Sequence, residues 1–211
     1  MSISILFLLI LQWVGCFSAF APVAKPVALF DGKTFKGWQG DTVQTWRIED
    51  GALIGGSLVK EVPHNEFLST TKSYSNYELR LKFKLTGTGF VNAGVQLRSR
   101  RATNPAYEMI GYQADLGEKY WGCLYDESRR DSVLARPDEK AVTKVLKSGE
   151  WNNYRIRCEG KRIQLWINGF QTVDYIESDN SIPQSGLIAL QIHGGGKAQV
   201  AYKDLIIEEL P

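Results

Sequence analysis

The stretch Tyr77–Leu85, YELRLKFKL, carries the clearest fold signal in the chain. Apolar and charged side chains alternate along its whole length, as they do in a β-strand with one face in a core and the other in water. A strand with one charged face is typical of an antiparallel sheet, because parallel strands are usually covered on both faces. The apolar set is Tyr77, Leu79, Leu81, Phe83 and Leu85, and the charged set is Glu78, Arg80, Lys82 and Lys84.

Short strands bounded by turn residues follow on both sides of this stretch. Asp50-Gly51 between two strand-like runs is a strong hairpin signal, and turns at 160–161 and 168–169 divide residues 154–176 into a three-stranded meander. No segment of any length shows the 3.6-residue apolar period of a helix. The pattern predicts an all-β fold, a two-sheet antiparallel jelly-roll sandwich. The predicted core includes Leu79, Leu81, Phe83, Val95, Leu97, Ile156, Leu165, Ile188 and Leu190.

Length and charge narrow the class of protein. The 211 residues and 44% hydrophobic content suit one globular domain with a proper core. We assign residues 27–211 to this domain and residues 22–26, PVAKP, to a linker. A net charge of +2 without a block of Lys or Arg argues against nucleic acid as the main partner. The sequence does not predict the oligomeric state.

Residues 1–21 differ in character from the rest. Ile3–Leu11 is almost unbroken apolar sequence, and Ala19-Phe20-Ala21 matches a small-x-small cleavage site, so a secretory signal peptide is predicted. The alternative is a lipoprotein signal with Cys16 as the lipidated residue. A membrane span is disfavoured because the apolar run is shorter than the about 20 residues that a span needs. We expect a secreted or periplasmic protein.

Export would leave Cys123 and Cys158 in the mature chain. Two cysteines in an oxidising compartment can form a disulfide, but they can equally remain as separately buried thiols. The sequence leaves both alternatives open, because the distance between the two Cα atoms decides.

A second stretch, Tyr107–Arg130, concentrates polar and aromatic side chains: YEMIGYQADLGEKYWGCLYDESRR. It is predicted to form a hairpin with a polar, aromatic tip. Aromatic rings beside planar amides, carboxylates and guanidinium groups suit a sugar, which presents apolar C–H faces and a rim of hydroxyls. The alternative is an amphipathic hairpin whose rings are core and whose charges are solvated. Its candidate site residues are Glu108, Gln113, Asp115, Tyr120, Trp121, Asp126 and Arg129.

Three other strands place planar hydrogen-bonding groups or tryptophan on the side opposite their apolar residues. A tryptophan among amides is unusual on a purely solvated surface. We therefore expect one concave sheet face that binds a ligand, with the hairpin tip as its rim. The alternative is that a loop covers Trp166 and that the amides pair across strands. The candidates on this face are Gln96, Arg98, Trp166, Asn168, Gln191 and His193.

The sequence lacks the common catalytic and cofactor motifs. It contains no Cys/His metal spacing, no P-loop and no serine-centred elbow. A Glu-x-Asp-x-x-Glu strand, as expected in a retaining glucanase of similar shape, is also absent. No pair of carboxylates for glycosidase chemistry is therefore apparent in the sequence. No cofactor is predicted. A divalent cation could polarise a substrate carbonyl, but no ligand set for one is apparent.

Five motifs are spread along residues 27–210: LFDGK with GW at 29–38, WRIEDGAL at 46–53, NAGVQLR at 92–98, GEWN at 149–152 and GLIALQIHG at 186–194. Together they resemble the 3-keto-disaccharide hydrolase domain family. The resemblance implies a concanavalin A-like jelly roll in an exported protein. It also implies a glycoside substrate whose C3 hydroxyl has been oxidised to a ketone.

The resemblance further implies a reaction. A ketone at C3 acidifies the C2 hydrogen, so a base removes it, the C1 substituent leaves and water then adds. Elimination followed by hydration and direct hydrolysis both remain open. The candidates are Asp115 or His193 for the base, Arg98 for the enolate oxygen, and Glu108 or Asp126 for the acid. The substrate-binding candidates are Gln96, Gln113, Tyr120, Trp121, Arg129, Trp166, Asn168 and Gln191.

The main hypothesis is therefore an enzyme that cleaves a 3-keto glycoside. The rival is a non-catalytic carbohydrate-binding module with Trp121 and Trp166 as stacking platforms, and a structural or adhesion domain is a third hypothesis. Acids and a histidine favour the enzyme, because a pure binder needs aromatics and amides more than titratable groups. We predict that Arg98 keeps a neighbouring Asp115 ionised. One cavity is predicted to be lined by Arg98, Gln113, Asp115, Trp121, Trp166, Gln191 and His193.

Overall fold

The computed structural model describes residues 25–211. The predicted signal peptide, the alternative lipidation site Cys16 and most of the predicted linker lie outside the described residues. Among the described residues, no helix has the length and apolar character that crossing a bilayer requires.

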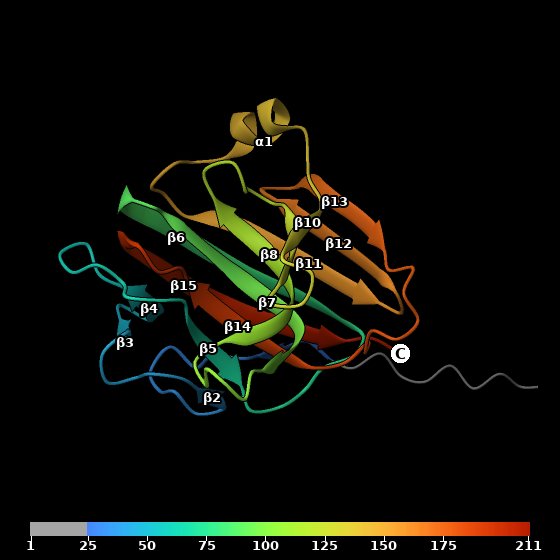
Figure 1. Ribbon diagram of the computed structural model, residues 1–211, viewed down its shortest axis with the longest axis horizontal. Coiled ribbons are helices and arrows are strands. Elements are labelled where there is room, and N and C mark those ends of the chain that lie inside the picture. Colours follow the sequence, from blue (N-terminus) through green and yellow to red (C-terminus); the bar gives the residue numbers. More distant parts are fainter. Residues whose placement is uncertain (1–24) are drawn as a thin grey trace, which may run out of the picture.

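The chain folds into two antiparallel sheets that pack face to face (Figure 1). The larger sheet has the order β13-β12-β11-β6-β15-β4-β3, with β1 paired to β15. The smaller sheet has the order β10-β9-β8-β7-β14-β5-β2. This arrangement confirms the predicted all-β sandwich. The strands of the larger sheet are β1 (Val27–Ala28), β3 (Trp46–Glu49), β4 (Ala52–Gly56), β6 (Tyr77–Gly89), β11 (Asn152–Glu159), β12 (Arg162–Ile167), β13 (Phe170–Ile176) and β15 (Gly196–Glu209). Those of the smaller sheet are β2 (Trp38–Gln39), β5 (Glu66–Thr70), β7 (Asn92–Arg101), β8 (Met109–Gly117), β9 (Leu124–Glu127), β10 (Ser132–Ala135) and β14 (Leu187–Ile192).

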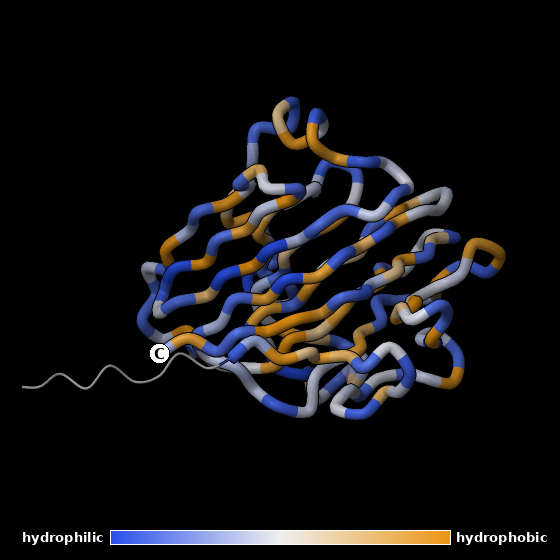
Figure 2. Tube along the Cα trace, turned by 180° about the vertical axis from the view of Figure 1, so that it is seen from behind, coloured by the Kyte–Doolittle hydropathy of each residue, from blue (hydrophilic) through white to orange (hydrophobic). Residues whose placement is uncertain are grey.

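Strand β6, which contains the stretch that decides the fold, lies in the middle of the larger sheet between β11 and β15. Its apolar side chains are buried between the sheets, whereas Arg80 on the other side is exposed. Figure 2 shows the same alternation of hydropathy along the long strands. Every residue of the predicted core is buried, with at most 2% of its surface exposed.

Two buried tyrosines of the larger sheet reach across the core to the backbone of the smaller one. The Tyr202 hydroxyl lies 2.9 Å from the carbonyl oxygen of Gly94 and 3.1 Å from that of Gln191. The Tyr154 hydroxyl lies 3.4 Å from the carbonyl oxygen of Asp115. A buried hydroxyl without a partner is costly, so these contacts favour one spacing between the sheets. They hold β7, β8 and β14 in place from the core side.

The polar segment between the central hairpin and the meander contains short elements that the sequence pattern did not indicate. Strand β10 extends the smaller sheet at its edge, and the helix α1 (Glu139–Val145) follows. The side chain of Asp138 caps this helix by accepting a hydrogen bond from the backbone of Lys140, and Val142 is its buried residue. Since α1 has only seven residues, the prediction of low helix content is confirmed.

The cysteines Cys123 and Cys158 are both free and buried. The structure therefore realises the alternative of two separate thiols rather than a disulfide. Each belongs to a different sheet region: Cys158 lies on β11, and Cys123 directly precedes β9. Burial raises the pKa of the Cys123 thiol to about 11, so this thiol stays protonated and unreactive at neutral pH.

Candidate active site

A cavity of about 100 Å³ opens on the outward face of the smaller sheet. Strands β7, β8 and β9 contribute its floor, and the turn before β7 and the residue after β14 contribute its wall. One water occupies about 30 Å³ in the liquid, so a glycoside would place only part of one ring here and extend over the surrounding surface. The lining residues are Phe90, Asn92, Gln113, Asp115, Tyr120, Tyr125, Glu127 and His193.

A chain of hydrogen bonds between buried side chains leads to this cavity. The hydroxyl of Ser99 donates to Oε1 of Gln96 over 2.5 Å, and Nε2 of Gln96 donates to Oε1 of Gln113 over 2.8 Å. Nε2 of Gln113 then donates to Oδ1 of Asp115 over 2.9 Å. All donors point the same way, so each bond polarises the next. This network fixes the amide orientations, because a reversed amide would set two donors or two acceptors against each other.

Burial favours the neutral form of the carboxyl group at the end of this chain. Burial raises the pKa of Asp115 well above its usual range, and the nearby Glu127 raises it further. Hydrogen bonds from Gln113 and Asn92 oppose this rise without cancelling it. Because Oδ1 accepts from Gln113, the acidic proton of the neutral group belongs on Oδ2. In its neutral form, which burial favours, Asp115 can donate a hydrogen bond or a proton.

Glu127 is the second carboxyl group of the cavity, and its proton affinity differs from that of Asp115. Burial raises the pKa of Glu127 to about 7, and repulsion from Glu108 and Asp131 adds to the effect. The amide of Gln191 opposes it through a long hydrogen bond of 3.5 Å. A carboxylate with a pKa near neutrality combines an ionised fraction with a strong affinity for a proton, which suits a general base. Two carboxyl groups in one cavity can divide the roles of acid and base where their environments differ.

The histidine of the cavity is oriented by the backbone. Nδ1 of His193 lies 2.7 Å from the carbonyl oxygen of Gly194. A carbonyl oxygen only accepts, so Nδ1 carries a proton, and Nε2 of the neutral ring has the free lone pair. The ring of Phe90 meets the imidazole edge to face, with 4.7 Å between ring centroids. His193 also attracts the charge of Glu108, whose pKa is raised by burial.

Two glycines leave room for the hydrogen-bonded chain. A Cβ atom on Gly94 would lie 2.7 Å from Cδ of Gln113, and one on Gly111 would lie 2.4 Å from the hydroxyl of Ser99. Both distances are far shorter than a van der Waals contact. Gly111 also has a φ angle of +146°, which favours glycine. A side chain at either position would displace a member of the chain.

The structure brings several of the predicted site residues together. Asp115, Gln113, Tyr120 and His193 line the cavity. The remaining predicted residues of this region lie beside or beneath it: Gln96 belongs to the hydrogen-bonded chain, Gln191 contacts Glu127, and Glu108 lies near His193. Oε1 of Gln191 is buried and has no hydrogen-bond partner among the described residues.

Arg98 lies elsewhere, and the prediction that it keeps Asp115 ionised is wrong. The register between β7 and β8 shifts after Leu97, and Arg98 has a φ angle of +49°. This bulge turns the side chain toward the end of the sandwich. The guanidinium group there donates to the carbonyl oxygens of Ser75 and Gly160 and to the amide oxygens of Asn76 and Gln184. Its contacts are those of a structural residue.

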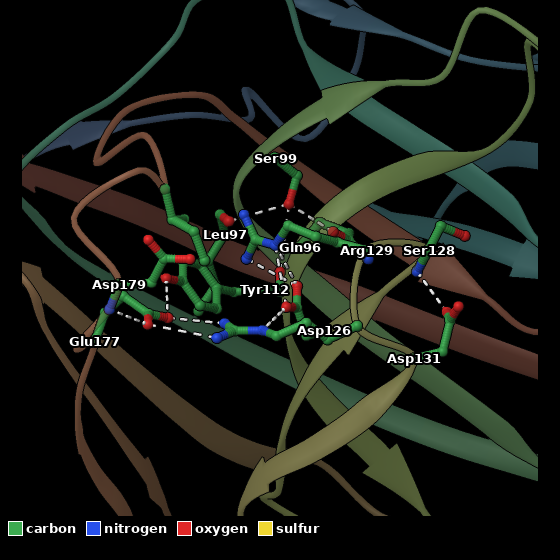
Figure 3. A network of polar contacts seen from close by, with 12 residues as sticks. Gln96, Leu97, Ser99, Tyr112, Asp126, Ser128, Arg129, Asp131, Glu177 and Asp179 are labelled. Carbon is green, nitrogen blue, oxygen red and sulfur yellow. Dashed lines mark hydrogen bonds and ion pairs between the residues drawn. The ribbon is translucent and has the colours of Figure 1, made fainter.

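Asp126 and Arg129 also lie outside the cavity, in the polar network of Figure 3. Asp126 faces the opposite side of β9 from Glu127, is fully buried and pairs with Arg129 and Arg130. Arg130 continues the network to Glu177, which also accepts from the hydroxyl of Tyr112 over 2.6 Å. These charges are engaged in joining the two sheets at one end of the sandwich.

The remaining three predicted residues, Trp166, Trp121 and Asn168, belong to other surfaces. The prediction of one shared cavity is therefore wrong for Trp166 and Trp121, as it is for Arg98. Trp166 lies on β12 of the larger sheet, and the outward faces of two packed sheets point in opposite directions. Its ring stacks under the guanidinium group of Arg155, 3.6 Å from the ring centroid. Trp121 packs against Phe83 at the core edge. Asn168 occupies a turn and donates to the backbone oxygen of Val145.

The sequence prediction missed four residues that line the cavity: Phe90, Asn92, Tyr125 and Glu127. The hairpin register contains a signal for two of them. Tyr125 pairs with Gln113 and Glu127 pairs with Gly111, so both share the outward face of Gln113 and Asp115. Alternation along β9 selects Glu127 for this face and assigns Asp126 to the other.

The cavity thus combines a carboxylate base, a neutral carboxyl donor and a histidine with an aromatic rim. Such a set can move protons to and from both carbon and oxygen atoms of a bound ligand. Within residues 25–211, no group of three or more His, Cys, Asp or Glu side chains is arranged to hold a metal ion.

The fold and the cavity define a two-sheet jelly-roll protein with a polar, aromatic cavity on one sheet face. More particularly, the chain belongs to the family of 3-keto-alpha-glucoside-1,2-lyase-like domains, which it matches over residues 25–208. The resemblance seen in its sequence motifs is thereby confirmed.

Individual relatives agree with this assignment. A 3-keto-disaccharide hydrolase of Bacteroides thetaiotaomicron is 31% identical over 155 residues, which are 62% of this chain and 51% of the relative. The chain therefore spans about half the length of that relative. A candidate glycosyl hydrolase of Parabacteroides distasonis has a similar structure, with a TM-score of 0.65, 19% identity and coverage of 88% of this chain and 94% of the other. A carbohydrate-binding module of Bacillus subtilis gives a TM-score of 0.62, 15% identity and coverage of 82% and 96%. At these identities the two structures share the fold.

Proposed function

We propose that this protein is an enzyme that cleaves 3-keto glycosides by elimination and hydration at the cavity on the smaller sheet. The observation that carries the proposal is the pairing of Glu127, with a pKa of about 7, and Asp115, with a pKa well above its usual range, in one cavity. The family and the name of the Bacteroides thetaiotaomicron relative support the choice of substrate.

In the first step, Glu127 acts as the base. Its carboxylate removes the proton from C2 of the sugar, and the electrons of the C2–H bond form the enolate with the C3 carbonyl. The oxygen of this enolate gains negative charge, which needs a hydrogen-bond donor close by. Asp115 supplies that donor from Oδ2, because burial favours its protonated form.

In the second step, the enolate collapses. The C3 carbonyl re-forms, a C1–C2 double bond appears, and the C1–O bond breaks. The departing oxygen takes the proton that Glu127 removed from C2, which returns Glu127 to its carboxylate form. Water then adds to C1 and gives a proton to the free lone pair on Nε2 of His193, whose Nδ1 is held by the backbone. This proton then returns to C2. The enolate role that was predicted for Arg98 thus passes to Asp115.

A non-catalytic carbohydrate-binding module remains the alternative, and one observation favours it. The structural likeness to the Bacillus subtilis module covers 82% of this chain. An aromatic rim of Phe90, Tyr120 and Tyr125 could bind a sugar without any reaction. The carboxyl groups of Asp115 and Glu127 favour catalysis, because a binding site gains nothing from carboxyl groups with raised pKa values.

Incubation of the purified protein with a 3-keto disaccharide and with the same unoxidised disaccharide tests the proposal. We expect release of the free monosaccharides from the oxidised substrate alone, together with exchange of the C2 hydrogen in deuterated water. Binding of both sugars without release or exchange would favour the binding module.

We also propose that the protein is exported, with residues 1–21 as the signal peptide and the domain starting near residue 27. This proposal rests on the apolar run and cleavage site in the sequence. Amino-terminal sequencing of the protein recovered from outside the cytoplasm would test it, and a lipid attached to Cys16 would support the lipoprotein alternative instead.

A further inference from the structure

A second and larger cavity, of about 720 Å³, lies where β7 and β8 meet the loop before β14. We call it the arginine cavity, because its lining includes Arg98, Arg100, Arg101 and Arg129. None of the described residues that line it carries a carboxylate. Serine hydroxyls, including those of Ser99 and Ser128, supply further polar groups.

The positive charge of this cavity is only partly cancelled. The four acceptors of Arg98 are neutral amide or carbonyl oxygens, and the exposed Arg100 forms no ion pair among the described residues. Arg129 pairs with Asp126, but this carboxylate lies buried beneath and is shared with Arg130, as Figure 3 shows for the labelled pair. A concave site lined by one sign of charge raises the local concentration of counter-ions. The lining therefore favours an anion.

The arginine cavity and the candidate active site share strands and hydrogen bonds. Ser99 lines the arginine cavity and begins the chain of hydrogen bonds that ends at Asp115. Ser128 lines it too and directly follows Glu127 in the sequence. The arginine cavity lies at the end of the sandwich, because Arg100 pairs with Ile110 on the side of the sheet opposite to Asp115. Since Glu127 and Ser128 are consecutive, a ligand with two linked sugar units could extend from the candidate active site around the end of the sheet.

We propose that the arginine cavity binds an anionic group of the glycan: a carboxylate, a sulfate ester or a phosphate ester. The ketone-bearing ring then occupies the candidate active site. This proposal rests on the proposed function and adds that the substrate is an acidic glycan. Arg100 is the side chain that is free to bind the anion, since its guanidinium offers planar paired donors. Arg98 adds charge from its fixed position beneath.

Binding of single sugars tests the proposal without any need for turnover. Glucuronate, glucose and inorganic sulfate would each be titrated into the purified protein at low salt, with binding followed by nuclear magnetic resonance shifts. We expect glucuronate to bind about ten-fold more tightly than glucose, as one charge-assisted contact provides. Added salt should remove this advantage but leave glucose binding unchanged. Equal affinity for glucuronate and glucose would overturn the proposal.

A matched pair of arginine variants locates the site. Arg100→Gln should lose most of the ten-fold advantage of glucuronate, whereas Arg155→Gln, on the outward face of the other sheet, should stay within about two-fold of the parent. Equal losses in the two variants would overturn the assignment of the site. Sulfate binding that depends on Arg100, without any preference for glucuronate, would show a site for free anions and overturn the glycan assignment. A failure of turnover with the anion preference intact would refute the proposed catalysis alone.

Discussion

The amide nitrogen of Gln113 donates to Oδ1 of Asp115 over 2.9 Å, and both side chains are almost fully buried. This contact leaves Oδ2 as the proton-bearing atom of a neutral carboxyl group. Replacing Asp115 by Asn should keep the shape and the contact with Gln113 while removing the acidic proton. We expect turnover of a 3-keto glycoside to fall by about two to four powers of ten, as for the loss of a general acid or base. Sugar binding, measured by titration, should change by less than about three-fold.

The pH profile of this variant distinguishes the role of Asp115 from that of a base. If Asp115 only donates, the residual activity of Asp115→Asn keeps the same rise with pH as the parent. A profile that loses this rise would assign the base to Asp115 instead. Unchanged turnover in the variant would leave the binding-module alternative ahead.

Glu127 should set the dependence of activity on pH. Its pKa of about 7 means that the ionised base accumulates as pH rises, so kcat/KM should increase up to about pH 7 and then level off. Glu127→Gln should abolish this limb and lower turnover by at least about 100-fold. Initial rates between pH 5 and 9 check both expectations. If kcat/KM of the parent were already at its plateau at pH 5, as for a base with a pKa near 4.5, Glu127 would not be the base.

The same shift predicts an effect on stability. The folded pKa of Glu127 is raised above its usual value, so folding costs nothing extra while the group is protonated below about pH 4.5. The cost grows between about pH 4.5 and 7, where the unfolded chain has ionised but the buried group still holds its proton, and it is constant above pH 7. Glu127→Gln should therefore raise the free energy of unfolding at pH 8 by on the order of 2 kcal/mol relative to its effect at pH 5. Urea denaturation at the two pH values measures this difference.

Gly94 should be essential for the shape of the site. A methyl group there would lie 2.7 Å from Gln113, so Gly94→Ala must push that amide away from Asp115. We expect turnover to fall by about ten-fold or more, with a smaller loss of stability of about 1–3 kcal/mol. Kinetics and denaturation of the variant give both numbers. Gly169→Ala is the control, because nothing lies near its Cβ position and the strain of its φ angle would affect stability alone.

The fold could be predicted from the sequence because it depends on alternation. In Tyr77–Leu85 and the strands around it, the face of each residue follows from the period of two, and every predicted core residue is buried. Asp115 and Gln113 were found for the same reason, since they alternate with Tyr112 and Ala114 on β8.

What alternation cannot supply is which sheet a strand joins and where its register shifts. Trp166 has the expected outward position, but its strand lies in the other sheet. Arg98 follows the parity of Gln96 until the bulge at its own position turns it aside. Glu127 was missed because its role depends on burial by neighbouring strands, which raises its pKa and which no local pattern reveals.

Arg98 should matter for stability and not for chemistry. Its guanidinium group bonds four oxygens from segments that are distant in the sequence, including Ser75 and Gly160. Lysine keeps the charge but cannot reach all four, so Arg98→Lys should lower the free energy of unfolding by about 2–3 kcal/mol. The kcat of the folded protein should stay within about two-fold. A large loss of kcat with normal stability would return Arg98 to the active site.

Glu177 should be the most sensitive single position at the end of the sandwich. Its buried carboxylate accepts from Arg130 over 2.7 Å and from Tyr112 over 2.6 Å, and these bonds outweigh the effect of burial and lower its pKa to about 2. Glu177→Gln removes one of the two carboxylates that pair with Arg130 and leaves it only Asp126, which Arg129 shares. We expect a loss of about 3 kcal/mol in the free energy of unfolding.

The pH dependence of this loss follows from the sign of the shift. The folded pKa of Glu177 is depressed, so its contribution is fully present above about pH 4.5 and disappears as pH falls toward 2. The difference between the parent and Glu177→Gln should thus be constant from pH 6 to 8 and shrink below pH 4. Asp179→Asn, at an exposed neighbouring position, should lower the free energy of unfolding far less under the same conditions. A similar loss in both variants, or a loss that grows as pH falls, would show that the network of Arg130, Tyr112 and Glu177 does not hold the two sheets together.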